Sequence, residues 1–431
     1  MSKIDWYNEF VDTDYTPAKD DLVVLYYFES PEGMTKEESA GRIASESSTG
    51  TWTTLTNLPP RMEALKAKAF DIEGTYVKVA YPRDLWEDGN FCQLKSGIAG
   101  NIFGMKGIEN LRLLDCRFPQ DYIKYFKGPI LGMEGLRKRW KVPRRPLTGA
   151  VPKPKIGFSA QEHAEIGYET WMGGFDFVKD DENLTSVKFN RFEERVKFLA
   201  KYRDKAENET GDRKGAFINI TAETEEMKRR ADLIHQYGFD YAMIDVVIVG
   251  TAALMTMRDY LGDLGITIHA HRAMHAAFDR NPRHGITMQF IAKEMRLIGV
   301  NQLHSGTAVG KLVGSREEVA SIADVLREKK TPEKEHVLLG QDWGAIKSAF
   351  PVSSGGLHPG LVPDVVDIYG LDMILLISGG IHGHPEGTRA GAKASLQAIE
   401  AVIDGETLEE KAKTSPELRS ALDKWDHHKP K

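Results

Sequence analysis

Gly173-Gly174-Phe175-Asp176-Phe177-Val178-Lys179-Asp180-Asp181-Glu182-Asn183 is an apolar run that leads directly into four charged residues. Residues 175–178 predict a buried strand. Charge that is buried is costly unless it is paired or bound to a metal. Asp181 and Glu182 offer the oxygen ligands that Mg²⁺ prefers, and Lys179 would offer a third if CO₂ converted its amine into a carbamate. The alternative is a solvated turn after a strand, because charge runs usually face water.

The composition excludes several classes of protein. The chain has 431 residues, 41% hydrophobic and 28% charged, which is ordinary for a globular protein and leaves room for two domains. A formal net charge of −6 argues against a nucleic-acid partner. Cys92 and Cys116 are too few for a disulfide framework, and no apolar run reaches 18 residues. We therefore expect a cytoplasmic protein without a signal peptide or a membrane span.

The first part of the chain, residues 1–125, is expected to be an α+β domain, and residues 126–146 a connector. The connector contains the basic, proline-bearing run Lys138-Arg139-Trp140-Lys141-Val142-Pro143-Arg144-Arg145-Pro146. We interpret this run as a surface linker, because a lone basic run is a weak functional signal. In the first domain we expect strands at 22–28 and 75–81 and helices at 36–45 and 61–70.

From residue 147 onward, short apolar runs alternate with longer, charged, helix-periodic segments. Eight strands that alternate with helices over about 250 residues predict a (β/α)₈ TIM barrel. We expect the barrel to span residues 147–400, with a helical extension at 401–431. The expected strands are residues 148–151, 175–178, 216–221, 242–246, 266–270, 302–304, 349–353 and 373–377. The expected helices include residues 193–207, 223–237, 252–261, 287–298, 316–329 and 363–369.

Polar side chains gather at the expected carboxyl ends of these strands, where barrels of this kind build their active sites. Gly-Gly pairs let backbone amides approach a phosphate closely, and a guanidinium suits a phosphate or a carboxylate. A plain tight turn is the alternative for either glycine pair. Besides Lys179 and its carboxylates, the strand ends carry Lys153-Pro154-Lys155, His269-Ala270-His271-Arg272, His304-Ser305-Gly306-Thr307, Ser353-Ser354-Gly355-Gly356 and Ser378-Gly379-Gly380.

Lys311 follows Gly306-Thr307-Ala308-Val309-Gly310, a loop with glycines at both ends. This setting predicts a lid that closes over the substrate and brings one ammonium to a developing negative charge. The alternative is a lysine in a solvent-exposed loop. Of the histidines near these strand ends, His271 beside Arg272 suggests function, whereas we expect His269 and His275 to be structural.

The order of these motifs resembles that of the large subunit of ribulose-1,5-bisphosphate carboxylase/oxygenase (Rubisco), above all the archaeal form III enzymes. The resemblance covers nearly the whole chain. It is carried by Glu46-Ser47-Ser48-Thr49-Gly50-Thr51-Trp52-Thr53, Gly100-Asn101-Ile102-Phe103-Gly104, Lys153-Pro154-Lys155, the run from Gly174 to Glu182, His269-Ala270-His271-Arg272-Ala273-Met274-His275, the run from His304 to Lys311, and Ser354-Gly355-Gly356.

The resemblance implies the catalytic roles. Lys179 would be carbamylated by an activator CO₂, and the carbamate would bind Mg²⁺ together with Asp181 and Glu182. Lys153 and Lys155 would handle protons near the reacting carbons, and His271 would do acid–base or orienting work. Lys311 would close over the carboxylate that forms from the substrate CO₂.

The resemblance also implies the substrate contacts. Arg272 and His304 would hold one phosphate, and Ser354, with Gly355 and Gly356 beside it, would hydrogen-bond the sugar. The other phosphate would lie at Ser378, Gly379 and Gly380, with Thr51, Trp52 and Lys155 nearby. Glu46 and Asn101 would reach the barrel of a neighbouring subunit, so the minimal active unit would be a homodimer. The assembly would be this homodimer or a higher homo-oligomer of dimers, and no small subunit is expected.

The chain departs from the family pattern at two places. Ser378 stands where the family has the first of three glycines, and Ala150-Val151-Pro152 offers no match for a family threonine that touches the substrate. Both changes bear on phosphate affinity more than on the type of reaction.

The function implied is carboxylation of ribulose 1,5-bisphosphate to 3-phosphoglycerate, with O₂ competing for the same enediolate. The pathway would be salvage of nucleotide-derived (AMP) sugar phosphates or a carbon-fixing cycle. The alternatives are a Rubisco-like enolase that acts on a related sugar phosphate, and a silent barrel that serves as a binding module. Enolase relatives typically lose the loop lysine, and a silent barrel would have lost its charged strand ends. The presence of Lys153, His304, Lys311 and Ser354 favours the carboxylase.

Overall fold

The computed structural model describes residues 6–310, 314–426 and 428. Their backbone groups into two compact units, which are described here one at a time. The first unit comprises the described parts of Met1–Gly128, together with Met274–Ile298 and Glu328–Ile346. The second comprises Pro129–Ala273, Gly299–Arg327 and the described parts of Lys347–Lys431.

The first unit is built on a mixed sheet that has five strands within the described residues. The central strand pairs antiparallel with both of its neighbours, and the short edge strand from later in the chain joins in parallel. The sheet order is β10 (Gly285–Ile286), β4 (Asn110–Arg117), β1 (Leu22–Glu29), β3 (Tyr76–Tyr81) and β2 (Lys68–Glu73). The unit also contains α1 (Lys36–Glu46), α2 (Phe91–Ala99), α3 (Gln120–Ile123), α9 (Ala276–Asp279), α10 (Met288–Ile298), β12 (Lys330–Thr331), β13 (Gln341–Asp342) and the 3₁₀ turns η1 (Trp6–Phe10), η2 (Pro60–Leu65), η3 (Arg83–Leu85) and η4 (Asn101–Gly104).

The helix expected at residues 61–70 is wrong. The structure has the 3₁₀ turn η2 and then β2, whose Ala69 is in register with Val79 of β3. The segment is rich in Ala, Leu, Lys, Met and Glu, which favour helices in isolation. Pairing with β3 supplies backbone hydrogen bonds, and Ala67 and Ala69 are buried, so this tertiary gain overrides the local helix preference.

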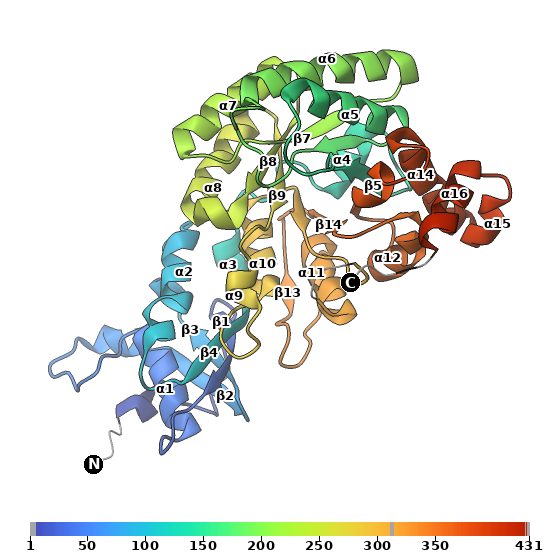
Figure 1. The fold of residues 1–431 in the computed structure, drawn as a ribbon. Helices are drawn as coiled ribbons and strands as arrows, with labels where there is room; N and C mark the ends of the chain where they lie inside the picture. The colour runs from blue at the N-terminus through green and yellow to red at the C-terminus, as the bar shows by residue number, and fades with distance from the viewer. Residues whose placement is uncertain (1–5, 311–313, 427, 429–431) are drawn as a thin grey trace. The chain divides into compact units, whose positions relative to one another are not determined.

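The second unit contains the predicted TIM barrel. Within the described residues, eight parallel strands close on one another, and each lies where the sequence placed it (Figure 1). In barrel order the strands are β5 (Leu147–Ala150), β6 (Phe177–Lys179), β7 (Gly215–Asn219), β8 (Tyr241–Asp245), β9 (Thr267–His271), β11 (Gln302–His304), β14 (Phe350–Ser354) and β15 (Ile374–Leu376).

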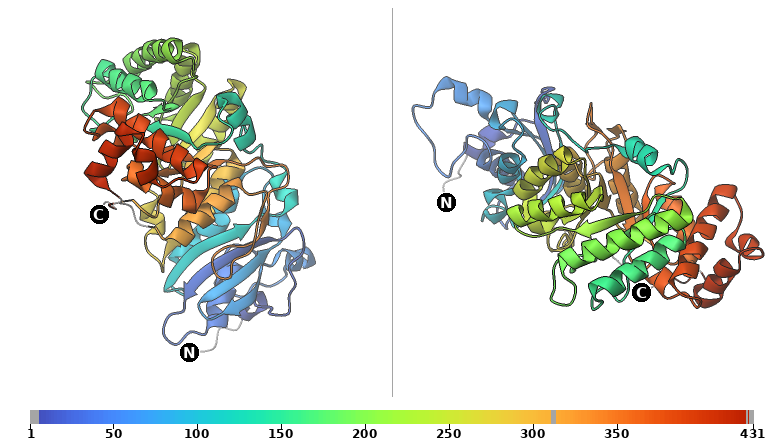
Figure 2. Two further views of the ribbon diagram at one scale, coloured as in Figure 1. Left: turned by 90° about the vertical axis from the view of Figure 1, so that its right-hand side faces the viewer. Right: turned by 90° about the horizontal axis from the view of Figure 1, so that it is seen from above.

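Helices cover the outside of this barrel, with α5 (Ala160–Met172) and α6 (Phe192–Thr210) side by side (Figure 2). Local signals fix their ends: Ser159 and Glu162 form a capping box at the start of α5, and Gly211 takes a left-handed conformation after α6. The other helices of the unit are α4 (Met133–Trp140), α7 (Thr224–Gln236), α8 (Val246–Asp263), α11 (Arg316–Arg327), α12 (Val362–Tyr369), α13 (Gly379–His382), α14 (Thr388–Asp404), α15 (Leu408–Ala412), α16 (Pro416–Trp425) and the 3₁₀ turn η5 (Pro359–Leu361).

Aromatic and aliphatic side chains fill the amino-terminal end of the barrel. Phe177 and Phe217 stack on each other, and both meet the ring of Tyr241 edge-to-face. Trp140 of α4 packs against the same cluster. The predicted connector is therefore helical through Trp140, and its buried indole belongs to the core. Within the described residues, no helix is both long and apolar enough to cross a membrane. The polar strand ends lie at the opposite, carboxyl-terminal end.

Candidate active site

The charged run at the end of β6 is largely buried. Lys179 is 1% exposed, Asp181 is buried beside it, and Glu182 is partly exposed. Nζ of Lys179 donates a 2.8 Å hydrogen bond to the carbonyl oxygen of Asp180. Burial lowers the pKa of Lys179, and the attraction of Glu182 and Asp181 offsets this only in part. More of this amine is therefore uncharged at neutral pH than of an exposed lysine, and the uncharged form is the one that reacts with CO₂.

Asp180 turns to the other side of the strand. Its Oδ2 accepts hydrogen bonds of 3.0 Å from Nε of Arg195 and 3.0 Å from the backbone amide of Asn219. Its Oδ1 lies 3.1 Å from Nε2 of His163. Burial alone would raise the pKa of Asp180, but these neighbours outweigh it and hold the pKa below its usual range. Asp180 is therefore an anchor for the strand end.

The two remaining carboxylates face basic side chains. Oδ2 of Asp181 lies 3.6 Å from Nζ of Lys153, and Oε1 of Glu182 lies 3.6 Å from Nζ of Lys155. Burial lowers the pKa of Lys153, although Asp181 and Glu182 counteract it. Nδ2 of Asn219 holds the turn by donating to the carbonyl oxygens of Asp181 (3.3 Å) and Glu182 (3.2 Å).

His271, at the end of β9, lies between two acids. Its Nε2 is 3.7 Å from Oε2 of Glu182, and its Nδ1 is 3.3 Å from Oδ1 of Asp245. The backbone amide of Ala273 donates to Nδ1 at 3.2 Å, which places the proton of a neutral ring on Nε2. Burial lowers the pKa of His271, with Asp245 acting in the opposite direction. A neutral imidazole whose N–H faces the carboxylates can orient or exchange a substrate proton.

A directed chain of hydrogen bonds ends at Ser354. Nε2 of Gln302 donates to the hydroxyl of Tyr241 (3.1 Å), so its Oε1 accepts from Nδ1 of His269 (2.6 Å). Nε2 of His269 must then accept from Nε2 of His304 (3.0 Å), and Nδ1 of His304 accepts from the hydroxyl of Ser354 (2.8 Å).

Burial lowers the pKa of both His269 and His304 well below the ordinary value, consistent with neutral rings. The oxygen lone pairs of Ser354 are thereby left for a substrate hydroxyl. Both ring nitrogens of His304 are engaged, so in this arrangement its effect on a ligand passes through Ser354. The expected phosphate contact of His304 stays a prediction.

The two predicted phosphate loops, at Gly355-Gly356 and at Gly379-Gly380, require glycine for different reasons: backbone conformation in the first and close packing in the second. Gly355 and Gly356 take left-handed backbone conformations, with φ of +113° and +76°. A Cβ at Gly380 would lie 2.4 Å from Cα of His358, whereas nothing lies within 4 Å of a Cβ at Gly379. Gly380 is thus required by packing, and the open side of the turn is at Gly379.

Ser378 uses its hydroxyl inside the protein. Its Oγ accepts a 3.0 Å hydrogen bond from the backbone amide of Val151, and the carbonyl oxygen of Val151 lies 3.0 Å from Nε2 of His382. The serine that replaces a family glycine therefore ties this loop to the end of β5.

The loop after β11 packs on the loop after β14. A Cβ at Gly310 would lie 1.8 Å from the carbonyl oxygen of Gly355, and Oγ1 of Thr307 accepts a 2.7 Å hydrogen bond from the amide of Gly310. Arg272 is buried and packs against Gly306 at the start of this loop. A Cβ added to Gly306 would lie 3.1 Å from Nη2 of Arg272. Lys311 itself lies outside the described residues.

Residues predicted to act on a neighbouring subunit lie in the first unit. Glu46 is the exposed last residue of α1, Asn101 is exposed at the start of η4, and Trp52 is 79% exposed. The hydroxyl of Ser47 donates to the carbonyl oxygen of Gly97 in α2, which brings the end of α1 to the segment that leads into Asn101. Thr51 is partly exposed, and its carbonyl oxygen accepts from the indole of Trp6.

The donor set at β6 suits a hard divalent cation such as Mg²⁺, which proteins often hold through one or two carboxylates. Asp181 and Glu182 supply carboxylate oxygens. Within the described residues, they do not form a group of three close ligand atoms with any further His, Cys, Asp or Glu. A carbamate on the buried Lys179 would provide the third oxygen.

Sequence reasoning did not single out Asp245, Asn219 or Arg195. Asp245 ends β8 and Asn219 ends β7, so both could have been found by the same rule that selected the other strand ends. Arg195 acts through its contact with Asp180, which no local pattern reports.

Comparisons with known proteins identify the family of this chain. Residues 9–122 match the family described as "Ribulose bisphosphate carboxylase large chain, N-terminal domain", and residues 132–425 match its "catalytic domain". The chain is 54% identical to the ribulose bisphosphate carboxylase of Pyrococcus furiosus, over 100% of both chains.

Solved structures give the same result. The octameric Rubisco of Pyrococcus horikoshii OT3, in complex with sulfate ion, has a TM-score of 0.91 and 52% identity over 98% of each chain. The dimeric archaeal Rubisco of Hyperthermus butylicus has a TM-score of 0.92 and 44% identity, covering 98% of this chain and 99% of that one. The chain belongs to the ribulose bisphosphate carboxylase large chain family.

Proposed function

We propose that this chain carboxylates ribulose 1,5-bisphosphate, and that O₂ competes with CO₂ for the same intermediate. The observation that carries the proposal is the buried amine of Lys179 beside Asp181 and Glu182, with Lys153, Lys155 and His271 facing these acids. Full-length similarity to named carboxylases supports it.

Lys179, as a carbamate formed with an activator CO₂, would hold Mg²⁺ together with Asp181 and Glu182. The chemistry supplied by bound Mg²⁺ is Lewis-acid polarisation of the substrate carbonyl. Asp180 keeps this group in place, because its own carboxylate is committed to Arg195 and Asn219.

Proton transfer falls to Lys153 and His271. Burial lowers the pKa of Lys153, which brings a lysine closer to the pH at which it can both give and take a proton. His271 presents an N–H toward Glu182, and its other nitrogen accepts a hydrogen bond from the backbone amide of Ala273. A base takes the C3 proton, C2 of the enediolate bonds to CO₂, water adds at C3, and the C2–C3 bond breaks. The carbanion left at C2 then takes up a proton, so that two molecules of 3-phosphoglycerate form.

Substrate phosphates would lie at the two ends of the strand-end surface. We assign one to Arg272 and the other to the open turn at Gly379, with Lys155 nearby. The hydroxyl of Ser354, oriented by His304, would accept from the sugar. Gly355, Gly356 and Gly380 let the backbone take the required course.

We further propose a homodimer as the minimal active unit, without a small subunit. Similar chains form a dimer in one archaeal enzyme and an octamer in another. In this arrangement Glu46, Thr51, Trp52 and Asn101 of one subunit would complete the site of its partner.

The test is fixation of labelled bicarbonate into an acid-stable product that depends on ribulose 1,5-bisphosphate. Fixation by the wild-type chain, and loss by Lys179→Met with the fold intact, is expected. Solvent exchange of the C3 proton without any fixation would overturn the proposal and favour a Rubisco-like enolase. Absence of both reactions would favour a binding module.

A further inference from the structure

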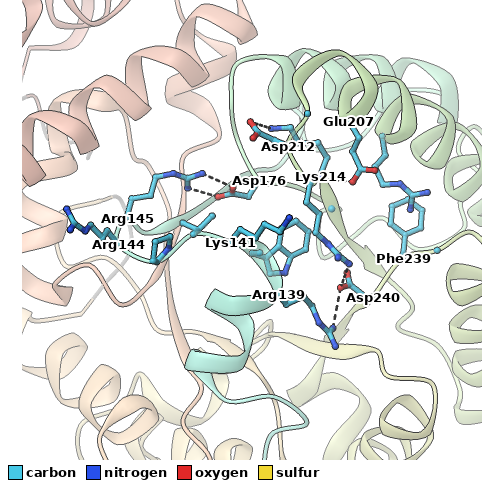
Figure 3. Close-up of a pocket in the computed structure, with 18 of the residues that line it drawn as sticks. Arg139, Lys141, Arg144, Arg145, Asp176, Glu207, Asp212, Lys214, Phe239 and Asp240 are labelled. Atoms are coloured by element: carbon cyan, nitrogen blue, oxygen red, sulfur yellow. Dashed lines mark hydrogen bonds and ion pairs between the residues drawn. The ribbon is translucent and has the colours of Figure 1, made fainter.

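A second charged cavity lies at the amino-terminal end of the barrel strands, away from the strand ends that carry Lys179 and His271. It has a volume of about 800 Å³. Arg145 precedes β5, Asp176 precedes β6, Lys214 precedes β7 and Asp240 precedes β8, and all of them line it (Figure 3). The basic run 138–146, interpreted above as a plain linker, supplies one wall.

The lining has an excess of positive charge. Among the described residues it contains seven Arg or Lys side chains against four Asp or Glu, a formal excess of three charges. Such an excess in a concave site attracts anions. A multiply charged group such as a phosphate matches it better than a single carboxylate.

One of the four acids in the lining, Asp176, already has partners within the protein. Asp176 accepts from both Nη atoms of Arg145 (2.7 and 2.8 Å) and from the amide and hydroxyl of Thr148 (2.8 and 3.0 Å). This group anchors β5 to β6, and most of the hydrogen bonds of its carboxylate go to Arg145 and Thr148. Arg145 and Asp176 thus serve stability, as is usual at this end of a barrel.

On another wall of the cavity, two guanidinium groups share a single carboxylate. Nη1 of Arg139 lies 3.2 Å from Oδ2 of Asp240 (Figure 3), and Nη2 of Arg213 lies 2.8 Å from the same oxygen. Arg213 also lies over the indole of Trp140, 5.1 Å from the ring centroid, which holds its guanidinium at the cavity wall. One carboxylate oxygen cannot neutralise two guanidiniums, so an anion would complete this group.

Further cations lie around the same space. Lys141 and Arg144 are exposed, and no ion pair is found for either within the described residues. The side chain of Lys214 is 1% exposed. Its Nζ donates a 3.3 Å hydrogen bond to the carbonyl oxygen of Phe175 and lies 3.8 Å from Oδ2 of Asp212, and Asp176 also attracts it. A buried ammonium whose ion pair is this long gains from an anion brought to it.

One acid is placed to recognise hydroxyl groups. Oε1 of Glu207 accepts a 2.9 Å hydrogen bond from the amide of Lys214, which fixes the carboxylate at the cavity wall. Its second oxygen can accept from a ligand hydroxyl. The volume is within the range of small-molecule sites and larger than a phosphate ion needs.

We infer that this cavity binds a small phosphorylated sugar or polyol, with the phosphate between Arg139 and Arg213 and the hydroxyls toward Glu207. The site is separate from the proposed active site, and it does not depend on the function proposed above.

The test is calorimetric titration of the full-length protein with glycerol 3-phosphate, inorganic phosphate and glycerol. The titrations use an Arg272→Ala background, which weakens phosphate binding at the strand ends. We expect glycerol 3-phosphate to bind about once per chain and more tightly than inorganic phosphate, and glycerol not to bind. Arg213→Ser should weaken binding about tenfold, because a charge-assisted contact is lost, and Arg144→Ser should weaken it less.

The matched control is Arg229→Ser, which removes a similarly exposed arginine that pairs with Glu193 and Glu226 outside the cavity. It should leave binding unchanged, and the unfolding temperatures of the variants should agree. Binding that persists unchanged in both Arg213→Ser and Arg144→Ser would overturn the inference. Equal affinity for inorganic phosphate and glycerol 3-phosphate would overturn the assignment of a sugar or polyol.

Discussion

Nε of Arg195 donates a 3.0 Å hydrogen bond to Oδ2 of Asp180, the acid that lies between Lys179 and Asp181 in the sequence. Both side chains are buried. The run of four charged residues at β6 is therefore divided in two: Lys179, Asp181 and Glu182 are available for chemistry, and Asp180 holds the strand end to α6.

Asp180→Asn should destabilise the protein. The change leaves the buried guanidinium of Arg195 without its counter-charge, and breaking such a pair costs about 3–5 kcal/mol. Urea unfolding measures the loss. Asp181→Asn is the matched control: it should unfold within about 1 kcal/mol of wild type and yet lose carboxylase activity. Equal stability of Asp180→Asn and wild type would contradict the anchoring role.

The same pair has a consequence for acid stability. The pKa of Asp180 is lowered in the folded chain, so its contribution is present above the pKa of an unfolded aspartate, about 3.9. It is lost as the pH falls through the lower, folded value. The stability difference between wild type and Asp180→Asn should therefore shrink below about pH 4.

Activation should depend on CO₂ at a pH lower than an ordinary lysine requires. Burial lowers the pKa of Lys179, so its neutral amine becomes available below the usual lysine range. Initial rates after preincubation with bicarbonate and Mg²⁺ should rise with pH and then level off. Lys179→Met should show no such activation. Full activity without preincubation, at every pH, would contradict the carbamate.

Lys311 should act after enolisation. Lys311→Ala should keep exchange of the C3 proton with solvent, while product formation falls about 100-fold or more, because an ammonium that stabilises transition-state charge is lost. Proton exchange by NMR and fixation of labelled bicarbonate measure the two steps. Equal loss of both would mean that the lysine acts earlier.

The active site should be shared between subunits. Glu46→Gln and Lys179→Met chains are each expected to be inactive. Mixed under conditions that allow subunit exchange, they should regain activity, because about one site per heterodimer would be intact if the sites are shared. Glu46 would serve its partner by holding Lys311 through a charge-assisted hydrogen bond. No recovery despite demonstrated exchange would mean that each chain builds its own site.

The barrel could be predicted strand by strand because its strands are short apolar runs that end in polar groups. β6 shows this well: Phe177 and Val178 are buried, and Lys179 marks the strand end. In the first unit the same reasoning misread residues 61–70, because the pairing of Ala69 with Val79 comes from another strand and not from the local sequence.

Site residues could be predicted where reactive side chains come directly after a strand in the sequence, as Asp181 and Glu182 do. They could not be predicted where function depends on a side chain's partners. His269 reads as a lone structural histidine, and its position between Gln302 and His304 emerges only from the packing of β9 beside β11. The use of the Ser378 hydroxyl by Val151 depends in the same way on β15 lying beside β5.

The contact between Gly310 and Gly355 limits how this enzyme can be diversified in the laboratory. Any side chain at residue 310 would collide with a carbonyl oxygen of the neighbouring loop. A library that randomises residues 306–310 and is selected for growth on fixed carbon would therefore recover glycine at 310. Variation in loop length or polarity would have to be accommodated at the other positions.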